Sequence, residues 1–150
     1  MARTVYILRG ISGSGKSTWV RKNLPAASVV STDNFWMQDG EYFVDVSRLE
    51  EAHADCFSKF CRCLSRGDCQ VVVDNTNGRV WQFRRYMEEA AKAGYDIKVV
   101  TIFCDPAIAA ARNIHNTPPE IIERQHQKLM EGCAEELPRG VAQEIVMNEV

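Results

Sequence analysis

The sequence predicts a single α/β domain with a mostly parallel sheet of four to five strands, helices on both faces and a short helical lid. Three observations lead to this prediction. Short apolar segments alternate with helix-type segments along the chain, which is the pattern of a parallel sheet covered by helices. A glycine-rich turn joins the first apolar segment to the first helical one. The length of 150 residues suits one domain spanning 1–150.

The expected strands are short, apolar and rich in β-branched residues, as buried parallel strands are. We expect strands at 4–8, 28–32, 70–73, 97–103 and 143–147. The expected helices carry start and stop signals or apolar residues at helical spacing. We expect helices at 17–24, 47–67, 80–93, 106–115 and 117–131. The second and fifth of these helices would begin with the capping boxes Ser47–Glu50 and Thr117–Glu120. The aromatic segment 34–45 is expected to be a loop, and 105–119 to be the lid.

Composition excludes few functions. The chain has 18 basic and 20 acidic residues, so it lacks the overall basic excess of many nucleic-acid-binding proteins, although a local groove of arginines would suffice. The six cysteines form no CxxC pair, which favours reduced thiols in a cytoplasmic protein over a disulfide framework or a zinc site. No apolar stretch has the length of a signal peptide or a membrane span.

The strongest local signal is a phosphate-binding loop. Gly10–Ser17 matches the pattern G-x-x-x-x-G-K-S/T and lies between an expected strand and an expected helix. The glycines let successive backbone N–H groups converge on phosphate oxygens at a helix N-terminus. Lys16 would reach the β- and γ-phosphates of ATP, and the Ser17 hydroxyl would ligate Mg²⁺. The predicted ATP-binding residues in this loop are Gly10, Ser12, Gly13, Ser14, Gly15, Lys16, Ser17 and Thr18.

Two aspartates stand where expected strands end. Asp33 follows the second strand and Asp74 the third. The carboxyl ends of parallel strands meet at one edge of a sheet, and ligands bind there. Phosphoryl transfer needs one group that orients or deprotonates the acceptor, and often a second acid near the metal. The residues alone do not assign the two roles.

Four segments together resemble the kinase domain of polynucleotide kinases, which phosphorylate 5′-hydroxyl ends of DNA or RNA, and related stand-alone P-loop kinases. The segments are Gly10–Ser17, 31–35 (STDNF), 74–77 (DNTN) and 112–115 (RNIH). The resemblance implies that Asp33 is the general base on the acceptor and that Asp74 lies near the metal. It also implies that Thr76 lies near the acceptor and that Arg112 in the lid contacts the donor phosphates. This chain departs from the family at two positions. Asn116 stands where the family often has a second lid arginine, and Trp36 stands where a relative has an arginine that grips substrate phosphate.

Other side chains extend the candidate site. Trp36 could stack on a base of the acceptor, and Arg79, followed by Arg84 and Arg85, could form a basic edge for a polynucleotide. His53 lies on an apolar helix face and is expected to be a hydrogen-bonded core residue. His115, in the lid, could help to hold phosphate or cap a helix end.

Three functions follow as hypotheses. The first is an ATP- and magnesium-dependent kinase with Lys16, Asp33 and Arg112 as catalytic residues and the 5′-hydroxyl end of DNA or RNA as acceptor. The second keeps the chemistry but uses a hydroxymethylated base within DNA, or a small molecule such as a nucleoside or sugar nucleotide. The third is a nucleotide-binding module without turnover. The oligomeric state stays open.

Overall fold

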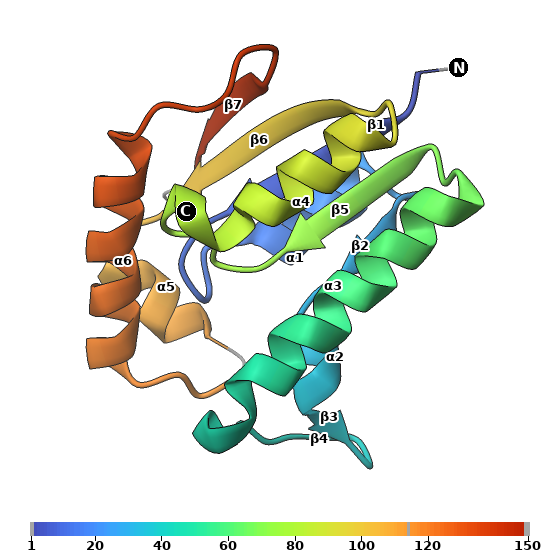
Figure 1. The fold of residues 1–150 in the computed structure, drawn as a ribbon. Helices are drawn as coiled ribbons and strands as arrows, with labels where there is room; N and C mark the ends of the chain where they lie inside the picture. Colours follow the sequence, from blue (N-terminus) through green and yellow to red (C-terminus); the bar gives the residue numbers. More distant parts are fainter. Residues whose placement is uncertain (1, 114, 149–150) are drawn as a thin grey trace.

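The computed structural model describes residues 2–113 and 115–148, and its centre is a five-stranded parallel sheet (Figure 1). The strand order is β2-β5-β1-β6-β7, and every neighbouring pair is parallel. The strands are β1 (Thr4–Arg9), β2 (Ser28–Val30), β5 (Gln70–Asp74), β6 (Asp96–Phe103) and β7 (Ala142–Met147). The predicted fold class is therefore confirmed, including the fifth strand.

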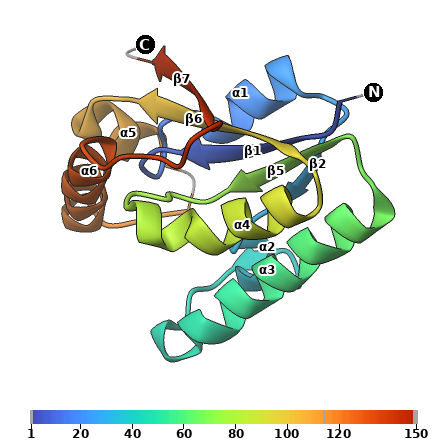
Figure 2. The ribbon, with the colours of Figure 1, turned by 45° about the horizontal axis from the view of Figure 1, so that its top comes forward.

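Helices cover both faces of this sheet because its central strands, β1, β5 and β6, bury apolar residues on both sides. The helices are α1 (Lys16–Asn23), α2 (Asp33–Trp36), α3 (Leu49–Arg66), α4 (Val80–Lys92), α5 (Pro106–Arg112) and α6 (Pro119–Cys133). Val71 and Val73 pack with α3 and α4, whereas Val72 between them packs with α1. Figure 2 shows α1 on one face and α3 and α4 on the other. This alternation explains why β5 is a continuous apolar run.

The segment expected to be a loop, 34–45, holds more structure than predicted. It contains most of α2 and a small antiparallel hairpin of β3 (Met37–Gln38) and β4 (Glu41–Tyr42). The hairpin turn places Asp39 and Gly40 at φ of 51° and 81°. Such left-handed pairs match the twist of two-residue hairpins, which is why Asp-Gly occurs there. The prediction recognised the turn but not the strands, because two-residue strands have no periodicity.

Both predicted capping boxes are wrong. The Asp45 carboxylate accepts a hydrogen bond from the Ser47 backbone N–H at 3.0 Å. It thereby caps a 3₁₀ turn, η1 (Val46–Arg48), before α3 starts at Leu49. A local aspartate turn has thus displaced the expected Ser47 cap. Helix α6 starts at Pro119 without a side-chain cap, since proline is preorganised for the first helical position.

The lid segment is only partly helical. Helix α5 ends at Arg112, because Asn113 has extended backbone angles, so the predicted helix over 106–115 is too long. Its predicted residue Ile114 lies outside the described residues. None of the helices in the described ranges combines the length and the apolar run needed to cross a bilayer. The six cysteines all fall within those ranges and are free thiols.

Candidate active site

The phosphate-binding loop curls around the ammonium group of Lys16. Its Nζ donates to the carbonyl oxygens of Gly10 at 2.8 Å and Ile11 at 3.1 Å. Burial lowers the pKa of Lys16, and the carboxylates of Asp74 and Asp33 oppose that shift. Gly13 has a φ of 83°, and a Cβ there would collide with the backbone of Ala109. Glycine at this position therefore allows both the turn and the close approach of α5.

Three distant segments hold this loop in place, and sequence reasoning missed two of them. The Gln125 side chain of α6 accepts from the Ser12 N–H at 2.9 Å. Asn148, beyond β7, donates its Nδ2 to the Ser14 carbonyl at 2.8 Å. The Gly10 N–H donates to the Thr76 carbonyl at 3.0 Å. Neither Gln125 nor Asn148 belongs to a recognisable motif, so only the fold reveals their contacts.

Ser17, at the start of α1, and Asp74, at the end of β5, bring a hydroxyl and a carboxylate together; we call them the oxygen pair. The Ser17 hydroxyl donates to Asp74 Oδ2 at 3.2 Å. Burial raises the pKa of Asp74; Lys16 opposes the shift and Asp33 adds to it. The described residues contain no cluster of three or more His, Cys, Asp or Glu side chains that could hold a metal. A carboxylate and a hydroxyl nevertheless fit Mg²⁺, which prefers oxygen ligands and retains several waters beside substrate phosphates.

Asp33, at the start of α2, has both carboxylate oxygens near other side chains. The Tyr42 hydroxyl donates to Oδ1 at 3.0 Å, and His115 Nε2 lies 3.8 Å from Oδ2. The Tyr42 and His115 rings stack with centroids 3.9 Å apart and an interplanar angle of 25°. The DNTN segment anchors the turn before Asp33, because Asn75 Oδ1 accepts from the Thr32 N–H at 2.9 Å.

These groups face one cleft of about 630 Å³. It is lined by all the predicted site residues except Gly10 and Arg79, namely Ser12, Gly13, Ser14, Gly15, Lys16, Ser17, Thr18, Asp33, Trp36, Asp74, Thr76 and Arg112. Further lining residues that the sequence did not single out as site residues include Arg21, Val44, Leu49 and Gln125. The side chain of Ser14 is buried, and its hydroxyl has no hydrogen-bond partner within the described part of the chain.

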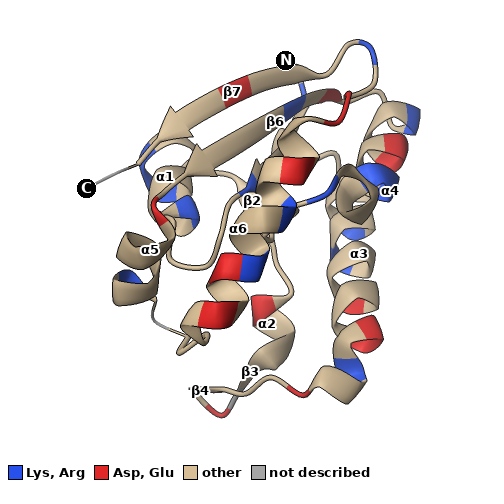
Figure 3. Ribbon diagram, turned by 90° about the vertical axis from the view of Figure 1, so that its left-hand side faces the viewer, with Lys and Arg blue, Asp and Glu red and all other residues tan. Residues whose placement is uncertain are grey.

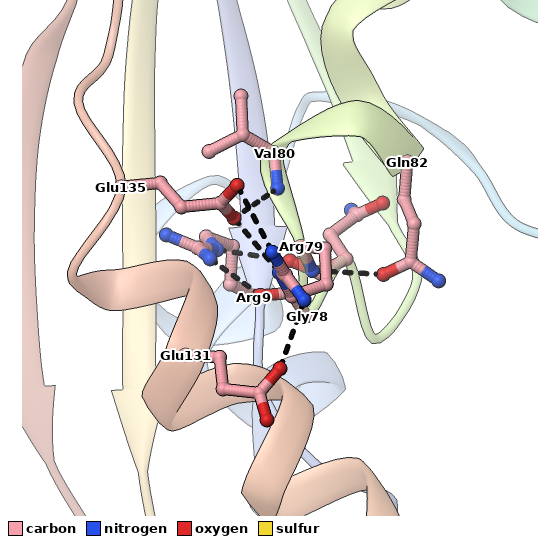
Figure 4. Close-up of polar contacts among 8 residues, drawn as sticks. Arg9, Gly78, Arg79, Val80, Gln82, Glu131 and Glu135 are labelled. Carbon is pink, nitrogen blue, oxygen red and sulfur yellow. Dashed lines mark hydrogen bonds and ion pairs between the residues drawn. The ribbon is translucent and has the colours of Figure 1, made fainter.

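Arg79 lies outside the cleft, where it forms ion pairs with two glutamates (Figure 4). Its Nη1 lies 2.8 Å from Glu131, and its Nε lies 3.0 Å from Glu135. Glu135 also accepts from the Val80 N–H at 3.1 Å, so the ion pair fastens the start of α4 to the end of α6. The expectation that Arg79 contacts the acceptor is therefore corrected: both acidic partners come from a segment 52–56 residues away, which local sequence does not reveal.

Trp36 and His53 also differ from their expected environments. Trp36 lines the cleft but is only 5% exposed and packs nearly perpendicular to Phe35, so little of its ring is free to stack on a substrate base. His53 is exposed and lines the cleft, which overturns its interpretation as a core histidine. Partial loss of water around the imidazole, and then the charge of Arg85, lower the pKa of His53. The start of α3 lines the cleft with Leu49 and His53, so part of the apolar face of this helix lies at the site and not in the core.

The segment after β6 brings Arg112 and His115 to the cleft. Arg112 Nη2 donates to the Cys104 sulfur at 3.2 Å. Beyond it, the Asn113 side chain donates to the Thr117 carbonyl at 2.8 Å and so closes a turn. His115 lines the cleft, whereas the exposed Asn116, at the position of the missing second arginine, is not among its lining residues.

Comparison with known proteins gives a match over most of the chain. Residues 5–137 match the protein family described as an AAA domain. NEDD4-binding protein 2 of Homo sapiens is 30% identical in an alignment of 131 residues that covers 80% of this chain and 7% of that protein. The chain therefore spans a small part of this curated relative.

Solved structures share the fold at lower identity. A chain of the Pnkp1/Rnl/Hen1 RNA repair complex superposes with a TM-score of 0.74 at 20% identity, over 92% of this chain and 49% of that chain. A gluconokinase from Sinorhizobium meliloti 1021 gives a TM-score of 0.57 at 20% identity, over 95% and 82% of the two chains. The fold is thus shared with a chain of an RNA repair complex and with a gluconokinase.

Proposed function

Because this chain belongs to the AAA domain family and has a P-loop kinase fold, we propose that it transfers the γ-phosphate of ATP to an acceptor hydroxyl. The observation that carries the proposal is the convergence of three groups on one cleft. These are the cradle around Lys16, the oxygen pair of Ser17 and Asp74, and the carboxylate of Asp33. A module that only binds nucleotide has no need of the third group.

The donor half of the cleft would hold the triphosphate. Backbone N–H groups of the loop and the Lys16 ammonium would face the phosphate oxygens, and Arg112, which also lines the cleft, would contact them. Mg²⁺ held by Ser17 and Asp74 would neutralise charge on the phosphates. The Lys16 contacts with Gly10 and Ile11 place its ammonium in the loop before ATP arrives, so little reorganisation is needed.

Asp33 would act on the acceptor. Its carboxylate orients the acceptor hydroxyl and takes the proton as the new oxygen–phosphorus bond forms and the bond to ADP breaks. The Tyr42 hydroxyl donates to Oδ1 of Asp33, whereas His115 Nε2 lies 3.8 Å from Oδ2, beyond hydrogen-bond distance, so Oδ2 is the oxygen proposed for the acceptor. The third hypothesis of a module without turnover is therefore not our proposal.

The first candidate acceptor is the 5′-hydroxyl end of a nucleic acid. Its support is the ordered set of four motifs, together with the likeness to a chain of an RNA repair complex. Such an acceptor would need contacts to backbone phosphates. Arg85 on α4 would supply one of them near His53, since it donates to the His53 carbonyl at 3.2 Å, and Arg84 precedes it on the same helix.

A second candidate, a small uncharged hydroxyl compound, is favoured by the charge around Asp33. The acceptor wall is lined by Trp36, Tyr42, Val44, Leu49 and His53. Figure 3 shows acidic positions on α2 and along the hairpin segment. Over residues 39–51 the acidic residues are Asp39, Glu41, Asp45, Glu50 and Glu51. The single basic residue of that stretch, Arg48, pairs with Glu51 at 2.8 Å. The excess of negative charge on this segment beside the cleft disfavours a polyanion.

Transfer from γ-labelled ATP to a panel of acceptors tests the proposal. The panel contains 5′-hydroxyl DNA and RNA oligonucleotides, 5′-blocked duplexes with hydroxymethylated bases, nucleosides, sugar nucleotides and gluconate. We expect label on one class, lost in Asp33→Asn, with Asp96→Asn, an exposed aspartate on β6, as the matched control. Salt-sensitive transfer would identify a polynucleotide, and salt-insensitive transfer a small neutral acceptor. Binding of ATP without transfer to any of them would contradict the proposal.

A further inference from the structure

The contact of Tyr42 with His115 joins the two halves of the cleft. Tyr42 comes from the hairpin on the acceptor side, and His115 from the segment that also carries Arg112. Their rings are stacked at 3.9 Å, directly beside the carboxylate of Asp33. Neither ring is required to fill the core, because His115 and Tyr42 are both only partly buried. Their arrangement therefore calls for an explanation at the site itself.

Tyr42 is held rigidly relative to Asp33. The turn at Asp39 and Gly40 closes the hairpin, and the Phe43 N–H donates to the Trp36 carbonyl at 2.9 Å. This bond ties the end of the hairpin to α2, the helix that begins with Asp33. Burial and then the Asp33 charge raise the pKa of Tyr42, so the phenol keeps its proton at neutral pH. The phenol is consequently the donor in the bond to Asp33, and the carboxylate the acceptor.

His115 is fixed to the donor side by its own turn. Its backbone N–H donates to Asn113 Oδ1 at 3.1 Å, and Asn113 follows Arg112 directly. Any displacement of Arg112 relative to the hairpin must therefore disturb the stack on Tyr42. The stack involves the ring of Tyr42, and the hydroxyl of the same side chain donates to Asp33. A continuous path of contacts thus runs from the donor-facing arginine to the acceptor-facing carboxylate.

We propose that Tyr42 is a positioning residue for Asp33 and that its stack with His115 couples the donor half of the cleft to the acceptor half. The inference rests on the proposed kinase function. With Arg112 drawn onto ATP, the stack holds Tyr42, and Tyr42 holds Asp33 toward the acceptor. Coupling of this kind is reciprocal, so loss of the stack must also weaken ATP binding. The two functions of Tyr42, its hydroxyl and its ring, can be separated by substitution.

Two pairs of variants make this separation. Tyr42→Phe removes the hydroxyl and keeps the ring; we expect kcat to fall about 10-fold or more, as for a lost hydrogen bond to a charged group, with parental affinity for a non-hydrolysable ATP analogue. Tyr42→Leu removes both, and its affinity for the analogue should also fall about 3–10-fold, the range of one aromatic pair. His115→Phe retains an aromatic ring and should keep the parental affinity for the analogue. His115→Ala removes the ring and should lose as much affinity for the analogue as Tyr42→Leu does.

The controls decide between coupling and simple damage. Phe43→Leu changes the neighbouring, 69% exposed side chain and should leave the affinity and kcat unchanged. In Tyr42→Leu/His115→Ala the loss of analogue affinity should equal that of one single variant, because both remove the same contact. The coupling would be overturned if Tyr42→Leu and His115→Ala bound the analogue with parental affinity. It would also be overturned if their losses of affinity added up in the double variant. An unchanged kcat in Tyr42→Phe would overturn the positioning role.

Failure of the kinase proposal gives a different result. If the parent protein transfers phosphate to no acceptor, water serves as the acceptor, and the rate of ADP formation replaces kcat in the comparison of Tyr42→Phe with the parent. The affinity measurements use the analogue alone and do not require turnover. The pattern across the two Tyr42 variants therefore supports or overturns the inference even then.

Discussion

The donor and acceptor halves of the cleft are built in opposite ways. The donor half is largely one contiguous stretch, Gly10–Ser17, whose backbone geometry follows from its glycines. The acceptor half is assembled from α2, a two-residue hairpin, the start of α3 and a segment beyond β6. The donor half is therefore visible in the sequence, whereas the acceptor half exists only in the fold.

The two halves also differ in charge. Lys16, Arg21 and Arg112 line the donor half. Among the described residues that line the acceptor wall, aromatic and aliphatic side chains surround Asp33 and no lysine or arginine is present. A triphosphate needs several cations, while a hydroxyl needs one well-placed base. The substitutions below test whether the two halves can be impaired separately.

Replacing Lys16 should have the largest effect. Lys16→Ala removes the ammonium that faces the donor phosphates, so we expect transfer to fall by about 10²–10³-fold or more and ATP affinity to fall with it. Lys22→Ala, which removes an exposed lysine from the same helix, is the matched control and should retain activity. Isothermal titration with ATP and a single-turnover assay measure the two quantities. Parental transfer by Lys16→Ala would break the assignment of the donor half.

Neutralising Asp74 should have an effect on stability that depends on pH. The pKa of Asp74 is raised in the folded protein, so the folded state favours the protonated form. Stability from this proton is present at low pH and lost as the pH rises through the folded pKa. Without metal or nucleotide, Asp74→Asn should therefore melt above the parent at pH 7–8, and the difference should shrink toward pH 4.

The same variant should lose its response to magnesium. Thermal scans with and without Mg²⁺ and ATP measure both effects, and Asp96→Asn is the control. An Asp74→Asn protein that is stabilised by Mg²⁺–ATP as strongly as the parent would contradict the role of the Ser17–Asp74 pair.

Replacing Arg79 should have the smallest effect on chemistry. Arg79→Ala removes the ion pairs to Glu131 and Glu135, so the unfolding temperature should fall while transfer and ATP affinity stay within about twofold. Thermal unfolding and the transfer assay, run on one preparation, separate the two effects. A selective loss of transfer to oligonucleotides would instead restore Arg79 to the acceptor site.

The sequence predicted the sheet because buried strands carry a continuous apolar pattern, as at Val71–Val73. It predicted the loop of Lys16 because the residues that contact the Lys16 ammonium, Gly10 and Ile11, belong to the same contiguous motif. It missed the hairpin, since Met37–Gln38 and Glu41–Tyr42 are too short for a periodic signal. It also placed Arg79 in the wrong environment, because its partners lie more than fifty residues away.

The central claim is that Asp33 serves the acceptor and not the donor. Asp33→Asn keeps the size of the side chain and its bond with Tyr42 but removes the base. ATP affinity and single-turnover transfer, measured on this variant beside Lys16→Ala, test the claim most directly. We expect Asp33→Asn to bind ATP within about twofold of the parent and to transfer about 10²–10⁴-fold more slowly. Transfer at the parental rate, or a loss of ATP binding as large as that of Lys16→Ala, would contradict the account.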